Sequence, residues 1–340
     1  MPAPNTSYGD LLSTTINKYS AKVSDNFSKN RPLLDHMRKN NNIISSGGVQ
    51  IQEAIMYQSA GNIKRYSGFE VIDVGLNNSI SSAVFDWKQY AGPVAVSGLE
   101  MIQNSSEEQK LELIGARVEA TGSGLMNLVS DDLFSSGTAD GGKQLGGLQL
   151  LVADSPATGT VGGIDRASNV FWRNVSFDAT TNGGAATTAA NITTYMSRVY
   201  QKVTRNGDEP DVIIMDDYYY ALFEQSVIDK QRFENGNKED TTQFGFSAYR
   251  FKNARVYNGG GFQGADSNPW DATVSGGCPY QHIYFLNSKY LKLRTVKGRD
   301  FKTIGDGKRV AINQDAEVQL MGWTGALTMN CAALQGVLVE

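Results

Sequence analysis

The sequence predicts an α+β protein, because strand-like, helix-like and mixed segments occupy separate parts of its 340 residues. Alternating apolar residues near Val49 and Ala83 predict two long strands. An apolar stripe from Leu111 to Leu133 predicts one long helix, and helix and strand patterns alternate after Ile192. A chain of this length exceeds an ordinary single-core domain, so we expect more than one structural unit.

The first segment, residues 1–46, is polar and rich in Asn and Ser, so it cannot bury an apolar face of its own. We predict an N-terminal arm with short helices at Tyr8–Tyr19 and Leu33–Lys39. The segment ends in Ser45-Ser46-Gly47-Gly48, which is a loop signal. Its start contains neither a basic stretch nor an apolar run, so we expect no signal peptide.

A two-stranded extended arm is predicted after this loop. The alternating apolar positions are Val49, Ile51, Ile55 and Tyr57. Phe69–Val74 and Ala83–Tyr90 continue the period-two pattern, which places the far end of the arm within Gly61–Ser79. An isolated hairpin is marginal in water, so we expect a partner to cover this one.

The long helix is predicted from Ser106 to Phe134, after a capping-box pattern at Ser105-x-x-Glu108. At about 1.5 Å per residue it would be roughly 40 Å long. Its three glycines each cost about 1 kcal/mol relative to alanine, so we expect a neighbouring element to approach the helix closely. These glycines are Gly115, Gly122 and Gly124.

The remainder predicts loops followed by a compact α/β subdomain. Residues 135–165 are rich in Gly, Ala and Thr and predict loop with one short strand at Leu148–Val152, and Val170–Phe177 predicts another strand. The subdomain is predicted to contain helices at Ile192–Val203 and Asp217–Asp229 and strands at Val212–Met215, Arg250–Tyr257 and His282–Leu286.

Charge and composition disfavour several functional classes. Lys and Arg number 31 against 35 Asp and Glu, so the chain lacks the cationic excess that tight nucleic-acid binding needs. Cys278 and Cys331 are too sparse for a disulfide framework, and we interpret them as free thiols in a reducing compartment. Histidine occurs only at His36 and His282. We therefore expect no metal, cofactor, disulfide or membrane span, and no enzymatic activity.

Two acids after the buried strand, Asp216 and Asp217, resemble the metal-binding strand end of a nucleotide hydrolase. That chemistry also needs a phosphate loop ending in Gly-Lys-Ser/Thr, whereas Gly307-Lys308 is followed by Arg309. We interpret Asp216 as a helix N-cap. A metal-dependent hydrolase using Asp216 and Asp217 stays as the alternative from a different class.

Three further clusters favour structural roles. Asp271 and His282 lack the Gly-x-Ser-x-Gly element of a hydrolytic triad, so His282 is interpreted as a strand histidine with satisfied hydrogen bonds. Tyr218-Tyr219-Tyr220 lies among acids and predicts packing within a helix rather than base stacking. The most basic stretch contains Lys289, Lys292, Arg294, Lys297, Arg299 and Lys302. We interpret it as a solvated strand face, with a neighbour's acids or packaged DNA as the alternative contact.

The order of elements resembles the major capsid proteins of tailed double-stranded-DNA bacteriophages, whose fold is named for phage Hong Kong 97. The likeness covers nearly the whole chain. The segments that carry it are Ile192–Phe223, Gly47-Gly48-Val49-Gln50-Ile51, Tyr66-Ser67-Gly68-Phe69-Glu70 and Trp323-Thr324-Gly325-Ala326-Leu327. The resemblance implies a Hong Kong 97-like α+β capsid fold with an N-terminal arm, an extended β-hairpin loop, a long spine helix, and peripheral and axial domains.

The resemblance also implies domain boundaries and a mode of assembly. The implied parts are an N-terminal arm (1–46), an extended loop with flanking strands (47–103), a peripheral domain with the spine helix (104–187), an axial domain (188–318) and C-terminal strands returning to the core (319–340). Copies of the chain would form hexamers and pentamers in an icosahedral shell, in the virion capsid, assembled in the bacterial host cytoplasm. An encapsulin-like nanocompartment shell is the alternative on the same fold.

The implied partners are other copies of the chain, a separate scaffolding protein, a portal and a decoration or cement protein. A separate scaffold is expected because fewer than fifty residues precede the strands of the extended arm. Packaged DNA would make only weak, non-specific contact. The candidate inter-subunit residues are Lys64, Arg65, Glu70, Asp73 and Lys88.

Overall fold

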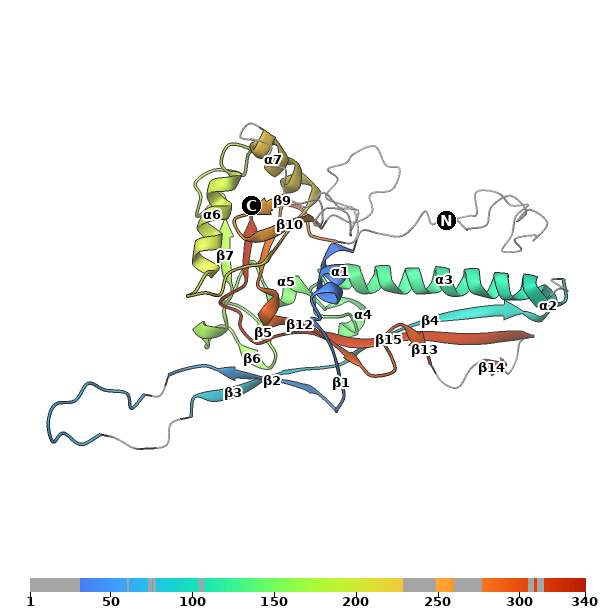
Figure 1. The fold of residues 1–340 in the computed structure, drawn as a ribbon, viewed down its shortest axis with the longest axis horizontal. Coiled ribbons are helices and arrows are strands. Elements are labelled where there is room, and N and C mark those ends of the chain that lie inside the picture. Colours follow the sequence, from blue (N-terminus) through green and yellow to red (C-terminus); the bar gives the residue numbers. More distant parts are fainter. Residues whose placement is uncertain are drawn as a thin grey trace.

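The computed structural model describes residues 31–59, 61–72, 75, 78–103, 107–228, 249–259, 277–304, 309–310 and 315–340. Figure 1 shows a central body from which a thin arm extends on one side and a long helix with two long strands extends on the other. In the body lies α1 (Pro32–Lys39), which confirms the helix predicted at Leu33–Lys39. The helix predicted at Tyr8–Tyr19 lies outside the described residues.

One sheet runs from the body along the spine. Its longest pairing joins β4 (Lys88–Ser97) antiparallel to β15 (Ala316–Met329) through ten residue pairs. β12 (Leu291–Val296) pairs with the C-terminal half of β15, and β1 (Ile43–Ser46) runs parallel to β12. β13 (Lys302–Thr303) and β14 (Arg309–Val310) also pair with β15. Residues 291–296, which the resemblance assigns to the axial domain, therefore share a sheet with the C-terminal strand β15.

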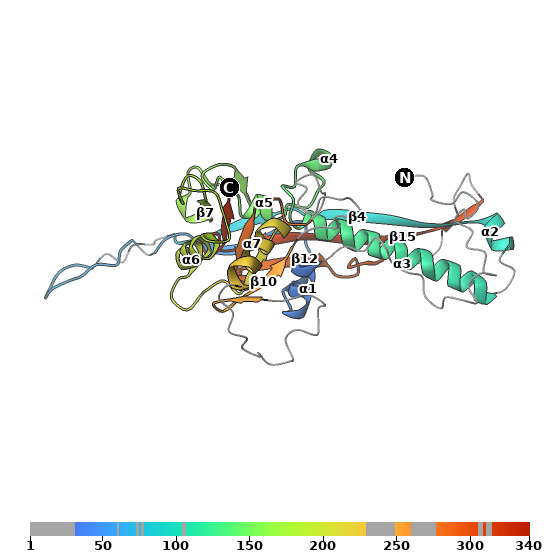
Figure 2. The ribbon, with the colours of Figure 1, turned by 90° about the horizontal axis from the view of Figure 1, so that it is seen from above.

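The predicted spine helix is α3 (Glu107–Asp132), which lies along this sheet in both views (Figures 1 and 2). Its 26 residues span about 39 Å at 1.5 Å per residue. Leu125 and Val129 on the predicted stripe are buried, and so is Leu133, just past the helix end. Capping residue Ser105 lies outside the described residues.

The helix and the sheet approach each other closely at a glycine of the strand. A Cβ atom on Gly92 in β4 would lie 2.7 Å from Thr121 Cγ2 on α3. On the helix, a Cβ on Gly122 would contact Met321 Cε at 3.6 Å, whereas Gly115 and Gly124 have open space beside them. The prediction that the helix glycines admit a close neighbour is therefore wrong for Gly115 and Gly124.

A second sheet forms the α/β subdomain. In spatial order its strands are β7 (Val175–Asp178), β16 (Gly336–Val339), β11 (Ile283–Leu286), β8 (Val212–Met215), β10 (Ala254–Asn258) and β9 (Tyr249–Phe251). α6 (Ile192–Val203) and α7 (Asp217–Ile228) pack on one face and confirm the two predicted helices. Ile213 and Met215 face these helices, while Val212 and Ile214 face the central core. A strand buried on both faces explains the continuous apolar run.

Five predicted strands differ in the structure. Ala83–Tyr90 is divided between the end of β3 (Ile80–Phe85), in the arm hairpin, and the start of β4, in the spine sheet. Leu148–Val152 forms a helical turn, α5 (Leu148–Leu151), instead of a strand. Val170–Phe177 begins as a 3₁₀ turn, η1 (Val170–Trp172), before β7. Arg250–Tyr257 is a hairpin of β9 and β10, because Lys252 has a positive φ of 54° between them. Phe69–Ile72 forms no strand, and residues 73–74 lie outside the described part.

The remaining described elements are small. They are α2 (Gly98–Gln103), α4 (Ala139–Gly142), β5 (Thr160–Val161), β6 (Ile164–Asp165), η2 (Ser288–Tyr290) and the arm strands β2 (Ile51–Met56) and β3 (Ile80–Phe85).

Candidate assembly surface

The extended arm begins as an antiparallel hairpin of β2 and β3. Its register runs from Ile51 paired with Phe85 to Met56 paired with Ile80. Alternate residues of β2 differ sharply in burial, because Ile51 and Ile55 face the body and are about 5% exposed while Met56 is 75% exposed. The body therefore covers one face of the hairpin, and the other face is open.

Beyond the strands, hydrogen bonds between the two limbs hold the loop together. The Tyr57 hydroxyl donates to the carbonyl of Asn78 at 2.7 Å, and the Tyr57 amide donates to the Ser79 carbonyl at 3.1 Å. Further out, Asn62 Nδ2 donates to the Gly75 carbonyl at 3.1 Å. These bonds satisfy backbone groups that are not paired in a β-sheet. They therefore hold the two limbs together where β2 and β3 have ended.

The arm carries most of the exposed large apolar side chains of the described residues. Eight of twelve lie between residues 49 and 80: Val49, Met56, Ile63, Tyr66, Phe69, Val71, Ile72 and Ile80. Phe69 is fully exposed and Val71 is 85% exposed. Scattered exposed apolar residues are ordinary, but a concentration on one narrow element is typical of a binding surface.

The candidate contact residues occupy different places. Lys64, Arg65 and Glu70 lie on the outer part of the arm and are exposed. The Lys64 ammonium donates to the carbonyl of Val71 across the loop. Asp73 lies outside the described residues.

Lys88 belongs to the body and not to the outer arm. It is the first residue of β4, where it pairs with Gly325 of β15. Its half-buried ammonium donates to the carbonyl of Gly142. The structure therefore separates Lys88 from Lys64 and Arg65, which the sequence grouped together.

The root of the arm is fixed by polar contacts on both strands. On β2, Glu53 Oε1 accepts hydrogen bonds from Arg294 Nε at 2.9 Å and from Thr328 Oγ1 at 2.9 Å. On β3, the amide of Val84 donates to the carbonyl of Gly162, in the β5–β6 turn, at 2.9 Å. Sequence reasoning missed Glu53, although a charged residue between two inward-facing isoleucines is a usable signal of a buried ion pair.

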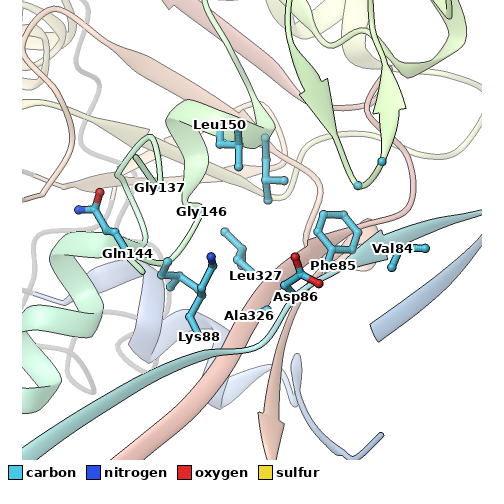
Figure 3. Close-up of a pocket in the computed structure, with 14 residues that line it drawn as sticks. Val84, Phe85, Asp86, Lys88, Gly137, Gln144, Gly146, Leu150, Ala326 and Leu327 are labelled. Carbon is cyan, nitrogen blue, oxygen red and sulfur yellow. The ribbon is translucent and has the colours of Figure 1, made fainter. Parts of the chain in front are cut away.

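A pocket of about 230 Å³ lies where the arm leaves the body. Figure 3 shows that it is bordered by Phe85 and Asp86 on the arm side and by Lys88, Gly146 and Leu327 on the body side. Its walls come from the end of β3, the start of β4, the loop before α5, and β15. This partly open space lies beside the packed contact through which Ile55 and Ala83 join the core of the body.

Asp216 is a helix N-cap, as the sequence predicts. Its Oδ1 accepts from the Tyr219 amide at 3.2 Å and its Oδ2 accepts from the Gln281 amide at 3.0 Å. Burial raises the pKa of Asp216 to about 6. Among the residues that the structure describes, no three His, Cys, Asp or Glu side chains gather where they could hold a metal ion.

The other clusters have structural partners. His282 Nε2 lies 3.2 Å from Asp154 Oδ2, and its Nδ1 lies 2.6 Å from the Tyr280 carbonyl, so both ring nitrogens are engaged. Asp271 and Gly307-Lys308 lie outside the described residues. Tyr219 and Tyr220 are buried in α7, which confirms helix packing.

The basic stretch is only in part a solvated face. Lys289 Nζ pairs with Asp208 at 2.9 Å at the surface, while Arg294 pairs with Glu53 and is mostly buried. Cys278 is buried and Cys331 is partly buried, and the two are not joined by a disulfide. No described helix is both long enough and apolar enough to cross a bilayer.

Comparison with known proteins gives likeness in structure without likeness in sequence. No protein-family model and no curated protein matches the chain. The chain is similar to a protein of the cyanophage A-1(L) capsid asymmetric unit, with a TM-score of 0.65 and 15% identity, over 94% of this chain and 95% of that one. It is also similar to the capsid of Myoviridae phage XM1, with a TM-score of 0.54 and 13% identity, over 98% and 99%.

A third similar structure is the holo-SrpI encapsulin complex from Synechococcus elongatus, with a TM-score of 0.52 and 11% identity, over 96% and 94% of the two chains. At such identities the likeness concerns the fold. It covers nearly the whole of each chain. The chain therefore has the capsid fold of tailed bacteriophages, the Hong Kong 97-like fold that its sequence predicts.

Proposed function

We propose that this chain is the major capsid protein of a tailed bacteriophage, forming hexamers and pentamers in an icosahedral shell that encloses double-stranded DNA. The observation that carries the proposal is the arm, which concentrates exposed apolar side chains on a hairpin that has no core of its own. Such a surface becomes stable when another copy covers it, and symmetry repeats the contact around a shell.

The proposed division into parts follows the resemblance: N-terminal arm 1–46, extended loop 47–103, peripheral domain 104–187, axial domain 188–318 and C-terminal strands 319–340. The proposed partners are other copies of the chain, a scaffolding protein, a portal and a decoration protein. DNA contact is proposed to be weak because the chain has a formal net charge of −4. Assembly would take place in the bacterial cytoplasm.

Negative-stain electron microscopy of the purified chain, alone and with its scaffolding protein, tests the proposal. We expect closed particles of uniform diameter built from clustered subunits. A chain that stays monomeric in both conditions, at every salt concentration tried, would contradict it.

An encapsulin-like compartment is the second candidate, because the likeness to the encapsulin complex also covers nearly the whole chain. Analysis of what native particles contain distinguishes the capsid from the compartment. A capsid is expected to protect double-stranded DNA from nuclease, whereas a compartment is expected to contain a co-purifying protein and no protected genome.

A further inference from the structure

On β2, the arm contacts the body through three alternate residues. Ile51, Glu53 and Ile55 face the body and are each less than 9% exposed, while the residues between them are exposed. Apolar contacts are non-directional, so the two isoleucines favour burial without fixing one angle of the hairpin. The hydrogen bonds of a charged group between them are directional, so they favour one angle of the hairpin.

Glu53 lies against two strands of the spine sheet at once. Its side chain is 9% exposed, and Oε1 lies 2.8 Å from Arg294 Nη2 and 2.9 Å from Arg294 Nε. The same oxygen accepts from Thr328 Oγ1. Arg294 is on β12 and Thr328 is on the adjacent strand β15, where it pairs with Lys292. One carboxylate therefore joins β2 to both strands.

Thr328 and Arg294 are themselves held in place. Thr328 is 1% exposed and its hydroxyl also lies 3.2 Å from the Lys292 carbonyl. The Arg294 side chain is 18% exposed, and its guanidinium meets Glu53 through two nitrogens. A planar guanidinium that donates twice constrains orientation more than a single ammonium does.

We infer that the Glu53–Arg294 pair is a positioning contact that sets the direction of the extended arm relative to strands β12 and β15. The consequence for shell assembly rests on the proposed function, because only a lattice requires every arm to point the same way. The effect of the pair on the direction of the arm in a single subunit does not depend on the proposed function.

Small changes at the root become large at the tip. From Glu53 to Ser67 the arm reaches at most roughly 45 Å, at about 3.3 Å per residue. A tilt of about ten degrees over that reach would displace the tip by roughly 8 Å. Such a displacement is large enough to separate apolar side chains from the neighbour that covers them.

The test measures the direction of the arm in unassembled subunits by double electron–electron resonance. Spin labels are placed at Ser67→Cys on the arm and Ala120→Cys on α3, both exposed positions, after both native cysteines are changed to alanine. Glu53→Gln keeps the shape of the side chain and removes its charge. We expect it to broaden the distance distribution and to shift its mean by at most roughly 8 Å, because only the part of the tip displacement that lies along the line between the labels changes their distance.

Three variants define the control and the coupling. Glu70→Gln removes the same charge from an exposed position on the arm and should leave the distances unchanged. Arg294→Lys keeps the charge but loses the two-nitrogen geometry, so it should give a smaller shift of the same kind. In Glu53→Gln combined with Arg294→Lys, the shift should be less than the sum of the two single shifts, because both substitutions disturb the same interaction. Circular dichroism checks that each variant is folded.

The outcomes separate the two ideas. Distances in Glu53→Gln that match the parent protein would overturn the positioning role. A shift in Glu53→Gln, with none in Glu70→Gln, supports it. If the parent never forms closed particles while Glu53→Gln still shifts the distances, the proposed shell function fails and the positioning role stands. If the parent forms closed particles, Glu53→Gln is expected to yield open or mixed-size assemblies.

Discussion

Asp216 follows an apolar strand, and burial there changes the chemistry of its carboxyl group. Desolvation raises its pKa from 3.8 to about 6, although hydrogen bonds from the amides of Gln281 and Tyr219 favour the ionised form. In the unfolded chain this carboxyl ionises near its ordinary value. Between the two values the folded chain binds more protons, so the contribution of Asp216 to stability falls as pH rises from about 4 to about 6.

Asp216→Asn is therefore expected to remove a pH dependence while keeping an N-cap oxygen. Urea unfolding of the unassembled subunit at about pH 4.5 and about pH 6.5 measures it. The parent should lose more unfolding free energy than the variant over this interval, by roughly 2 kcal/mol, because the interval starts above the unfolded pKa and so covers part of a shift of about two pKa units. Equal losses in both proteins would show that the carboxyl titrates in its ordinary range.

At the scale of elements, a strand glycine sets how closely α3 packs on its sheet. A methyl group on Gly92 would lie 2.7 Å from Thr121 Cγ2, which is too close for unstrained packing. Gly92→Ala should destabilise the subunit by about 1–3 kcal/mol, as overpacking does. Gly124→Ala is the matched control on the helix, where the added methyl meets open space and the gain in helix propensity should stabilise by about 0.5–1 kcal/mol. Thermal or urea unfolding measures both changes. If the unfolding free energy of both variants changes in the same direction relative to the parent, this packing is contradicted.

The arm is an element whose removal should cost the fold little. Replacing Gly61–Ser79 with a short turn deletes mostly exposed residues and keeps β2 and β3. We expect an unchanged far-UV spectrum and unfolding midpoint, but no closed shells, because stable interfaces usually bury more than about 1,000 Å². Particle size by light scattering and microscopy tests it.

A finer version of that experiment uses single side chains. Phe69→Ser changes a fully exposed residue of the arm, while Val170→Ser changes a 68% exposed residue of the body. We expect only the arm variant to weaken assembly. If the deletion protein forms normal shells, the arm is not the assembly surface. If its far-UV spectrum is that of an unfolded chain, the deleted segment contains part of the core.

At the scale of the whole molecule, charge on the outer arm, at Lys64 and Arg65, and at its root, at Lys88, is expected to tune assembly. Exposed ion pairs contribute only about 0–1 kcal/mol each, so reversing one charge should weaken assembly modestly and reversing Lys64, Arg65 and Lys88 together should weaken it strongly. Salt should diminish the difference, because it screens exposed charges.

Comparing the Lys64→Glu/Arg65→Glu pair with Lys88→Glu alone separates two effects. The first pair changes the outer arm, whereas Lys88 donates to Gly142 at the root. Sedimentation across a salt series measures both. A triple variant that assembles with unchanged salt response would contradict a role for these cations between subunits.

The sequence by itself determined the elements that depend on local periodicity. The alternation around Ile51, the stripe through Leu125 and Val129, and the apolar run Val212–Met215 each predicted a strand or helix that the structure contains. It also predicted the N-cap role of Asp216, because an acid between a strand and a helix has a local backbone partner. The prediction of a strand at Leu148–Val152 was wrong, since a short, mainly apolar segment fits a helical turn and a strand equally well.

Tertiary structure decided which elements pair and which charges are buried. Glu53 and Arg294 are 241 positions apart, and the partners of β4 lie in β15 near the end of the chain. Local patterns state which face of an element is apolar, but they do not state what covers it. For this reason the sequence does not distinguish Lys88 from Lys64. In the structure, the pairing of β4 with β15 places Lys88 in the body, whereas Lys64 lies on the outer arm.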